Sequence, residues 1–172
     1  MEQEDKTLLS EVASGSYDAA DRPFDFVEMG SKTVLVCVTD QAMRQKIGEA
    51  MNSLDYQVTE ATTARDALKS MRFHVYDIIV VVDGFDQSQP GVNDVLKNLE
   101  NLNMATRRQI FVALLSDRYR TMDNMAAFNR SVNITVNLKT LDDIGQIITQ
   151  GKADNDYFYH IFKETLKKVG RA

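Results

Sequence analysis

Residues 33–38 read Thr-Val-Leu-Val-Cys-Val and residues 78–82 read Ile-Ile-Val-Val-Val, and these two apolar blocks decide the fold. A strand in the middle of a parallel sheet has both faces covered by helices, so it consists of Val, Ile and Leu without alternating polar residues. Both blocks have this composition. We therefore predict that they are buried strands of a parallel sheet.

Helical and extended segments alternate around these two blocks. Between them, apolar residues at helical spacing follow Asp40, residues 56–60 form an extended segment, and a threonine of residues 62–63 can cap a helix with Ala67 and Leu68 on its inner side. After the second block come an amphipathic segment near 92–99, a strand at 110–115, a helix near 122–128, a weaker strand at 132–136 and a helix near 141–148. Right-handed crossovers place the helices of such a chain on both faces of the sheet. The pattern predicts an α/β fold with a doubly wound, five-stranded parallel sheet.

The length and composition fit one such domain with an extension at each end. The chain has 172 residues, of which 44% are hydrophobic, enough to bury a core. We divide it into an N-terminal tail or linker (1–31), the α/β domain (32–150) and a C-terminal helical extension (151–172). In the tail, Phe24, Phe26 and Val27 either cover an edge of the domain or contact a partner.

The C-terminal extension carries one apolar stripe at helical spacing. The residues of this stripe are Phe158, Ile161, Phe162, Leu166 and Val169. A stripe of this kind has to be buried against something. It either packs on its own domain as an additional C-terminal helix, or it pairs with a second subunit or another partner.

Composition argues against several kinds of partner. The net charge of −5 and the scattered Lys and Arg residues do not favour a nucleic-acid surface. No apolar stretch is long enough for a membrane span, and the acidic residues 1–5 do not form a secretory signal. The single cysteine, Cys37, cannot form an internal disulfide, which favours a reducing compartment. We therefore expect a cytoplasmic protein without nucleic-acid or membrane partners.

Residues 32 to about 150 resemble a response-regulator receiver domain of the CheY-like kind, as found in bacterial two-component systems. The resemblance rests on Arg44 in the first helix, Ala67 and Leu68 in the second, Tyr76 and Asp77 before the third strand, and the Pro90-Gly91 loop. It implies a flavodoxin-like fold and a role in signal transduction. In this family, an acidic pair after the first strand and an Asp ending the third strand bind magnesium, and that Asp accepts a phosphoryl group.

The acidic positions of the family are altered in this sequence. Val38 and Thr39 stand where the family has its acidic pair, with Asp40 beside them. Val82 stands at the phosphoacceptor position, and Asp83 follows one residue late. A shift of one residue turns a strand side chain to the opposite face, unless a bulge at the following glycine compensates for it.

The remaining family positions are only partly kept. Ser116 matches the hydroxyl residue that contacts the phosphoryl group at the end of the fourth strand. Asn137 and Leu138 stand at the place of the family's Lys, and Lys139 comes two residues later. Thr135 or a neighbouring residue stands at the aromatic switch position. Together, these departures indicate a degenerate receiver, or pseudo-receiver.

The main hypothesis is therefore a non-enzymatic protein-interaction module that is not phosphorylated and has no catalytic residue, cofactor or metal. The alternative is an atypical receiver in which Asp83 is the phosphoacceptor, Asp40 and Asp83 bind Mg²⁺, and Ser116 and Lys139 contact the phosphoryl group. A third alternative is an enzyme or small-ligand protein that uses the cleft at the carboxyl ends of the strands.

The resemblance also implies a partner-binding face, formed by the fourth helix, the fifth strand and the fifth helix, roughly residues 122–148. The candidate contact residues are Tyr119, Met122, Met125, Phe128 and Leu138 on this face, and Phe158 and Phe162 on the C-terminal helix. The partner is an unknown protein or a second copy of the chain, bound through this face or the C-terminal helix. Met and Phe at helical spacing also occur in cores, which is the alternative for these residues.

Overall fold

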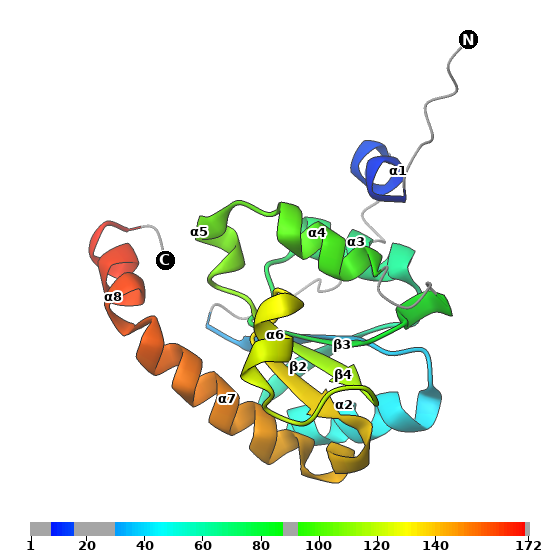
Figure 1. Cartoon of the computed structure of the whole chain (residues 1–172). Coiled ribbons are helices and arrows are strands. Elements are labelled where there is room, and N and C mark those ends of the chain that lie inside the picture. Colours follow the sequence, from blue (N-terminus) through cyan, green and yellow to red (C-terminus); the bar gives the residue numbers. More distant parts are fainter. Residues whose placement is uncertain (1–7, 16–29, 88–92, 171–172) are drawn as a thin grey trace.

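The structure, a computed structural model, describes residues 8–15, 30–87 and 93–170 (Figure 1). The expected apolar cluster at residues 24–27 and the loop at residues 90–91 lie outside these ranges. The elements are, in chain order, α1 (Leu8–Ser14), β1 (Lys32–Cys37), α2 (Gln41–Ser53), β2 (Tyr56–Ala61), α3 (Ala64–Phe73), β3 (Ile78–Val82), the 3₁₀ turn η2 (Phe85–Gln87), α4 (Asp94–Asn101), α5 (Met104–Arg107), β4 (Phe111–Ser116), α6 (Asn124–Asn129), β5 (Ile134–Asn137), the 3₁₀ segment η3 (Leu138–Asp143), α7 (Ile144–Phe158) and α8 (His160–Lys168).

The five strands form one parallel sheet in the order β2-β1-β3-β4-β5. The two apolar blocks of the sequence, β1 and β3, are neighbours inside this sheet, as predicted. The order reverses between β1 and β3, which is the arrangement of flavodoxin-like, doubly wound folds. Ligands of such folds bind outside the carboxyl ends of the strands near this reversal, so this edge is where a functional site is expected.

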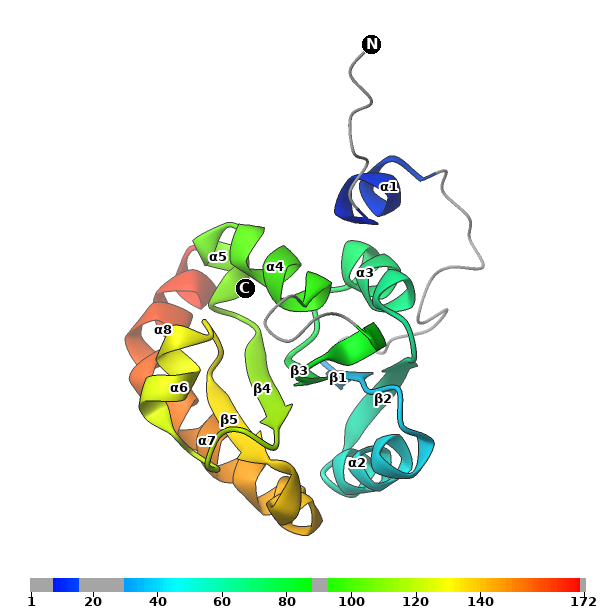
Figure 2. The same ribbon diagram turned by 45° about the vertical axis from the view of Figure 1, so that its right-hand side comes forward.

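Helices cover both faces of the sheet and give the molecule two core layers (Figure 2). Alternate strand residues point to opposite faces, so Val34 and Val36 lie in the layer beneath α2 and α7. Leu35 and Cys37 lie in the other layer, beneath α3, α4 and α6. Each of these four side chains is fully buried. The sheet is buried on both faces, which explains why residues 34–37 of β1 and all residues of β3 are apolar.

Side-chain caps fix the starts of the helices that follow β1 and β2. The carboxylate of Asp40 accepts a hydrogen bond from the backbone N–H of Met43, at 2.7 Å, and begins α2. Thr63 accepts one from the N–H of Asp66, at 3.1 Å, and begins α3. A cap of this kind satisfies an N–H group that has no partner within the helix. The threonine cap confirms the expectation for residues 62–63.

The C-terminal part differs from the expected helix near 141–148. α7 begins at Ile144 and continues to Phe158, so it runs across residue 150, where the domain boundary was drawn. Gly151 permits a close approach to the sheet, because a Cβ atom there would lie 3.0 Å from Ile134 Cγ2 and 3.1 Å from Phe111 Cζ. The chain turns at Tyr159 and continues as α8, which contains no buried residue. Within the described residues, no helix is long and apolar enough to cross a membrane.

Residues 8–14 of the N-terminal tail form the helix α1. α1 lies beside α3 (Figure 1), and its Val12 is buried. Arg72 of α3 donates hydrogen bonds to the backbone oxygens of Val12, at 3.0 Å, and Gly15, at 3.1 Å. Arg65 of α3 pairs with Glu11 at 2.8 Å. α1 is therefore attached to the outer side of α3.

Candidate functional site

The candidate site lies at the carboxyl edge of the sheet, where Asp83 follows β3. The register between β3 and β4 is continuous up to the pair Val82 and Leu115, so no bulge displaces Asp83. The backbone N–H of Asp83 extends this ladder by donating to the oxygen of Leu115, at 2.7 Å. Strand alternation then places the Asp83 side chain on the same face as Val81, beneath α3, α4 and α6. Val82 occupies the position on the opposite face.

Both oxygens of the Asp83 carboxylate are bound by groups of the chain itself. Oδ2 accepts hydrogen bonds from Ser116 Oγ, at 3.2 Å, and from Arg118 Nε, at 3.0 Å, and it also contacts Arg118 Nη2. Oδ1 lies 3.5 Å from Arg130 Nη2. The Asp83 side chain is only 8% exposed. A carboxylate this deeply buried is stable when it is paired and hydrogen-bonded, as it is here.

The two arginines come from different elements. Arg118 follows β4, where its backbone N–H donates to Ser116 Oγ at 3.1 Å. Its guanidinium carbon lies 5.4 Å from the centre of the Tyr119 ring. Hydrogen bonding to Asp83 raises the pKa of Arg118. Arg130 is the C-terminal cap residue of α6, and its side chain is mostly buried.

Sequence reasoning placed Asp83 beside Ser116 but did not find either arginine. Arg118 and Arg130 are 35 and 47 residues away from Asp83 in the sequence. The available signal was an arginine two residues after the strand that ends in Ser116. Such a residue starts at the same edge of the sheet as Asp83.

The structure does not add Asp40 and Lys139 to this cluster. Asp40 caps α2 and is exposed. The backbone N–H of Lys139 donates to Asn137 Oδ1, and its side chain forms no ion pair within the described residues. The described ranges also contain no group of three or more His, Cys, Asp or Glu side chains arranged to hold a metal ion. Because a hard divalent cation needs several oxygen ligands, this donor set does not fit the magnesium site of a receiver.

The end of β5 is fixed to the loop that precedes α6. Thr135 is fully buried; its hydroxyl donates to the backbone oxygen of Arg120, at 2.8 Å, and accepts from the N–H of Asp123, at 3.1 Å. Asn137 Nδ2 donates to the backbone oxygen of Tyr119 at 2.7 Å. Thr135, which we expected at or beside the family's aromatic switch position, thus binds the loop directly.

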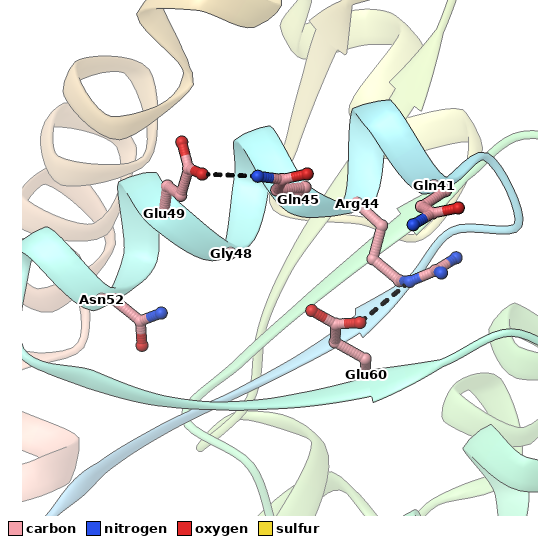
Figure 3. A pocket seen from close by; sticks show the side chains of 7 residues that line it. All are labelled: Gln41, Arg44, Gln45, Gly48, Glu49, Asn52 and Glu60. Atoms are coloured by element: carbon pink, nitrogen blue, oxygen red, sulfur yellow. Dashed lines mark hydrogen bonds and ion pairs between the residues drawn. The ribbon is translucent and has the colours of Figure 1, made fainter.

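A polar pocket lies beside the same edge, between α2 and β2 (Figure 3). Its volume is about 300 Å³, and it is lined by Gln41, Arg44, Gln45, Gly48, Glu49, Asn52 and Glu60. Arg44 Nε donates to Glu60 at 2.9 Å, and Arg44 Nη1 donates to the backbone oxygens of Val38, at 2.9 Å, and Thr39, at 3.0 Å. Arg44 therefore joins the end of β1 to the edge strand β2. It holds the segment where the family has its acidic pair.

The predicted partner residues divide into exposed and half-buried groups. Phe128 and Phe158 are each 78% exposed, and Met125 is 68% exposed. Met122 is 36% exposed. Tyr119 and Leu138 pack against the two core layers, and Phe162 lies half-buried beneath Arg108, so these three are less accessible.

No family model matches this sequence, and no curated protein matches it. Solved structures do match it in fold. They include the Francisella response regulator 1452 receiver domain (TM-score 0.54, 20% identity, covering 72% of this chain and 98% of that chain), HP1043, an orphan response regulator of H. pylori (0.54, 16%, 71% and 97%), and a response regulator receiver domain protein from Clostridium thermocellum (0.55, 15%, 74% and 98%).

The strand order and the helices on both faces define the class as a flavodoxin-like, doubly wound α/β fold. Within that class, the chain has the fold of a CheY-like response-regulator receiver domain, with an additional C-terminal helix. Both statements agree with the sequence analysis. At these identities, the similarity concerns the fold.

Proposed function

We propose that this chain is a receiver-like protein-interaction module of bacterial signalling or regulation that works without a phosphoaspartate and without catalysis. The observation that carries the proposal is the Asp83 carboxylate, whose two oxygens are bound by Arg118, Arg130 and Ser116. In a receiver, the acceptor oxygen has to attack a phosphorus atom, and a metal ion has to neutralise the transferred charge. The surroundings of Asp83 provide an internal ion pair instead.

Similar structures support a regulatory role. They include a DNA-binding response regulator of the LuxR family from Staphylococcus aureus and the N-terminal domain of a response regulator/sensory box/GGDEF 3-domain protein from Carboxydothermus hydrogenoformans. The second of these proteins has three domains, and the similar structure is its N-terminal domain. By analogy of fold, this chain would act by contacting a second protein or a second module, in the cytoplasm.

The exposed apolar residues support the interaction role. Met125 and Phe128 project from α6, and Phe158 and Ile161 lie at the junction of α7 and α8, each at least 68% exposed. Apolar side chains clustered on a surface are typical of protein contacts. We propose that the partner, a second copy or another protein, binds over α6 and the C-terminal helix. Light scattering over a concentration series tests the homodimer, which a constant monomer mass would exclude.

The alternative function is an atypical receiver with Asp83 as phosphoacceptor. The contact of 3.2 Å between Ser116 Oγ and Asp83 favours it, because a hydroxyl at this place contacts the phosphoryl group in receivers. Arg118 and Arg130 would then balance the phosphoryl charge instead of Lys139. The two functions differ in whether the Asp83 oxygens become available to a phosphodonor.

The test is incubation of the whole chain with Mg²⁺ and acetyl phosphate, followed by intact-mass measurement. We expect no phosphoryl adduct, while a receiver domain of known activity, treated in parallel, gains one. An adduct that disappears in Asp83→Asn would overturn the proposal and establish the alternative. Circular dichroism of the same samples shows that both forms of the chain are folded.

A further inference from the structure

A second surface, away from the Asp83 cluster, combines apolar walls with positive charge. It is a groove of about 480 Å³ near the amino ends of β4 and β5, at the end of the molecule where α5 and α8 lie (Figure 1). The residues that line it are Leu99, Glu100, Met104, Arg107, Arg108, Phe128, Ser131, Val132, Asn133 and Tyr159. Three of these are charged, and two of the three are arginines.

The apolar walls of the groove are largely uncovered. Phe128 of α6 is 78% exposed, and Met104 of α5 is 58% exposed. Leu99 and Val132 are buried. Large apolar side chains at the rim of a groove, above a buried apolar floor, are typical of a surface that an apolar side chain of a partner fills.

Arg107 places a positive charge in this groove, and no acidic side chain among the described residues forms an ion pair with it. Its guanidinium donates to the backbone oxygens of Ile110, at 2.9 Å, and Ser131, at 2.8 Å, and lies 3.5 Å from Asn133 Oδ1. All of these acceptors are uncharged. Burial lowers the pKa of Arg107, as expected for a cation that lacks a carboxylate partner.

Arg108 adds a second cation at the rim. Its guanidinium carbon lies 5.4 Å from the centre of the Phe162 ring, and the side chain is exposed. Within the described residues, neither Arg107 nor Arg108 forms an ion pair with an acidic side chain. Glu100, the acidic residue of the lining, is exposed and forms no ion pair with either arginine. The groove therefore carries net positive charge on a chain whose net charge is −5.

We propose that this groove binds a linear segment of a partner protein in which Asp or Glu residues stand next to an aromatic or aliphatic residue. The apolar side chain would lie between Met104 and Phe128, and the carboxylate would face Arg107 and Arg108. An arginine offers a carboxylate a charge-assisted hydrogen bond with defined geometry, and an arginine already stacked on a ring loses less freedom when it binds. The proposal rests on the interaction role proposed above and names the class of partner.

The experiment is selection of a random peptide library on the whole chain, followed by fluorescence anisotropy with the best labelled peptides. We expect the selected peptides to be enriched in Asp or Glu next to Phe, Leu or Met. Replacing their acidic residues by Lys should abolish binding. Peptides without acidic enrichment, or a selection that yields no binder, would overturn the proposal.

Variants of the chain locate the binding site. Arg108→Glu and Phe128→Ala should each weaken peptide binding by roughly tenfold or more, as for central contacts of an interface. The matched controls are Arg120→Glu, an exposed arginine in the loop after β4, and Val75→Ala, an exposed apolar residue before β3 that lies outside the groove lining; both should bind as the parent chain does. Equal binding by all four variants would overturn the assignment of the groove.

Two further outcomes separate this proposal from its alternatives. Concentration-dependent dimerisation that is lost in Phe128→Ala would assign the groove to a second copy of the chain and overturn the peptide proposal. Phosphorylation of Asp83 would instead refute the function proposed above, while the peptide result would remain valid. The two tests therefore fail independently.

Discussion

Two pairs of arginines in this chain have opposite surroundings. Arg118 and Arg130 close on the buried carboxylate of Asp83, whereas Arg107 and Arg108 line an apolar groove without an acidic partner in the described residues. Removing one partner of a buried ion pair destabilises the fold strongly, because the other charge is left buried and uncompensated. A cation without an internal partner keeps its capacity to attract a ligand. The comparison teaches that the aspartate at the carboxyl edge of the sheet is held by an internal ion pair, whereas the positive charge of Arg107 and Arg108 has no acidic partner among the described residues.

The largest effect on stability should follow from removing the carboxylate of Asp83, which pairs with Arg118 and Arg130. Asp83→Ala leaves Arg130, whose side chain is 19% exposed, without a counter-ion, and Ser116 and Arg118 lose their acceptor. Removing one partner of such a pair should lower the free energy of unfolding by about 3 kcal/mol. Urea denaturation followed by circular dichroism measures this loss. The control is Asp117→Ala, an exposed aspartate in the same loop, which should change stability by less than about 0.5 kcal/mol.

An equal small loss in both variants would contradict the comparison. It would mean that Ser116, Arg118 and Arg130 do not bind the carboxylate of Asp83 tightly, and that this carboxylate is available to a ligand or a phosphodonor. Asp83→Asn provides an intermediate case, because the amide oxygen can still accept hydrogen bonds while the negative charge is removed.

A smaller loss should follow from removing Arg107, although this arginine has no carboxylate partner. Arg107→Met keeps much of the apolar stem but leaves the oxygens of Ile110 and Ser131 without their donor. Hydrogen bonds of a charged donor predict a loss of about 2 kcal/mol. Thermal or urea unfolding, with Arg108→Met as the matched control, measures the difference. A loss as large as that of Asp83→Ala would show that the two pairs do not differ in the way proposed.

The fold could be read from the sequence because its central strands have an unmistakable composition. Residues 34–37 of β1 and all residues of β3 are apolar, which is typical of strands in a sheet covered on both faces, and their neighbours follow from the alternation with helices. The extent of α7 was less accessible. Residues 149–158 are mostly polar, and the packing of Gly151 against Phe111 and Ile134 depends on contacts that are distant in sequence. Local pattern therefore ended this helix too early.

The candidate site could be predicted only in part, for a related reason. Counting along β3 placed Asp83 one residue beyond the acceptor position, and the pairing of β3 with β4 is continuous up to Val82 and Leu115. Its arginine partners come from two other elements, and their meeting depends on how α6 and the loop after β4 are placed on the sheet. Side chains that converge from separate elements leave no spacing in the sequence by which they can be found.

The comparison of paired and unpaired cations extends to a histidine that becomes a cation only in acid. His74 is half-buried, and its Nε2 lies 3.0 Å from Thr33 Oγ1. The carboxylate of Asp77 accepts a hydrogen bond from the N–H of the same threonine, at 2.8 Å. Burial lowers the pKa of His74 below 6.5, with Asp77 opposing this shift. The unfolded chain therefore binds the proton more readily. The stability from neutral His74 is complete above pH 6.5 and is lost as the pH falls through the lower native pKa.

Unfolding measurements between about pH 5 and pH 8 test this dependence. His74→Gln should remove part of the stability loss at acidic pH. The difference in free energy of unfolding between the parent chain and this variant should therefore shrink, or change sign, as the pH falls. The exposed His160 provides the matched variant, His160→Gln, which should leave the pH profile in place. An unchanged profile in His74→Gln would show that the acid sensitivity originates elsewhere.

The smallest effect on stability is expected at Arg108, where the comparison is sharpest. The side chain is exposed, stacks on Phe162 and, within the described residues, pairs with no acid, so Arg108→Ala should change the free energy of unfolding by less than about 0.5 kcal/mol. The same substitution should nevertheless weaken the acidic peptide, because the lost charge served binding and not folding. Parallel unfolding and anisotropy measurements on one preparation distinguish these roles. A variant that loses stability and binding together would make Arg108 part of the scaffold, like Arg118 and Arg130.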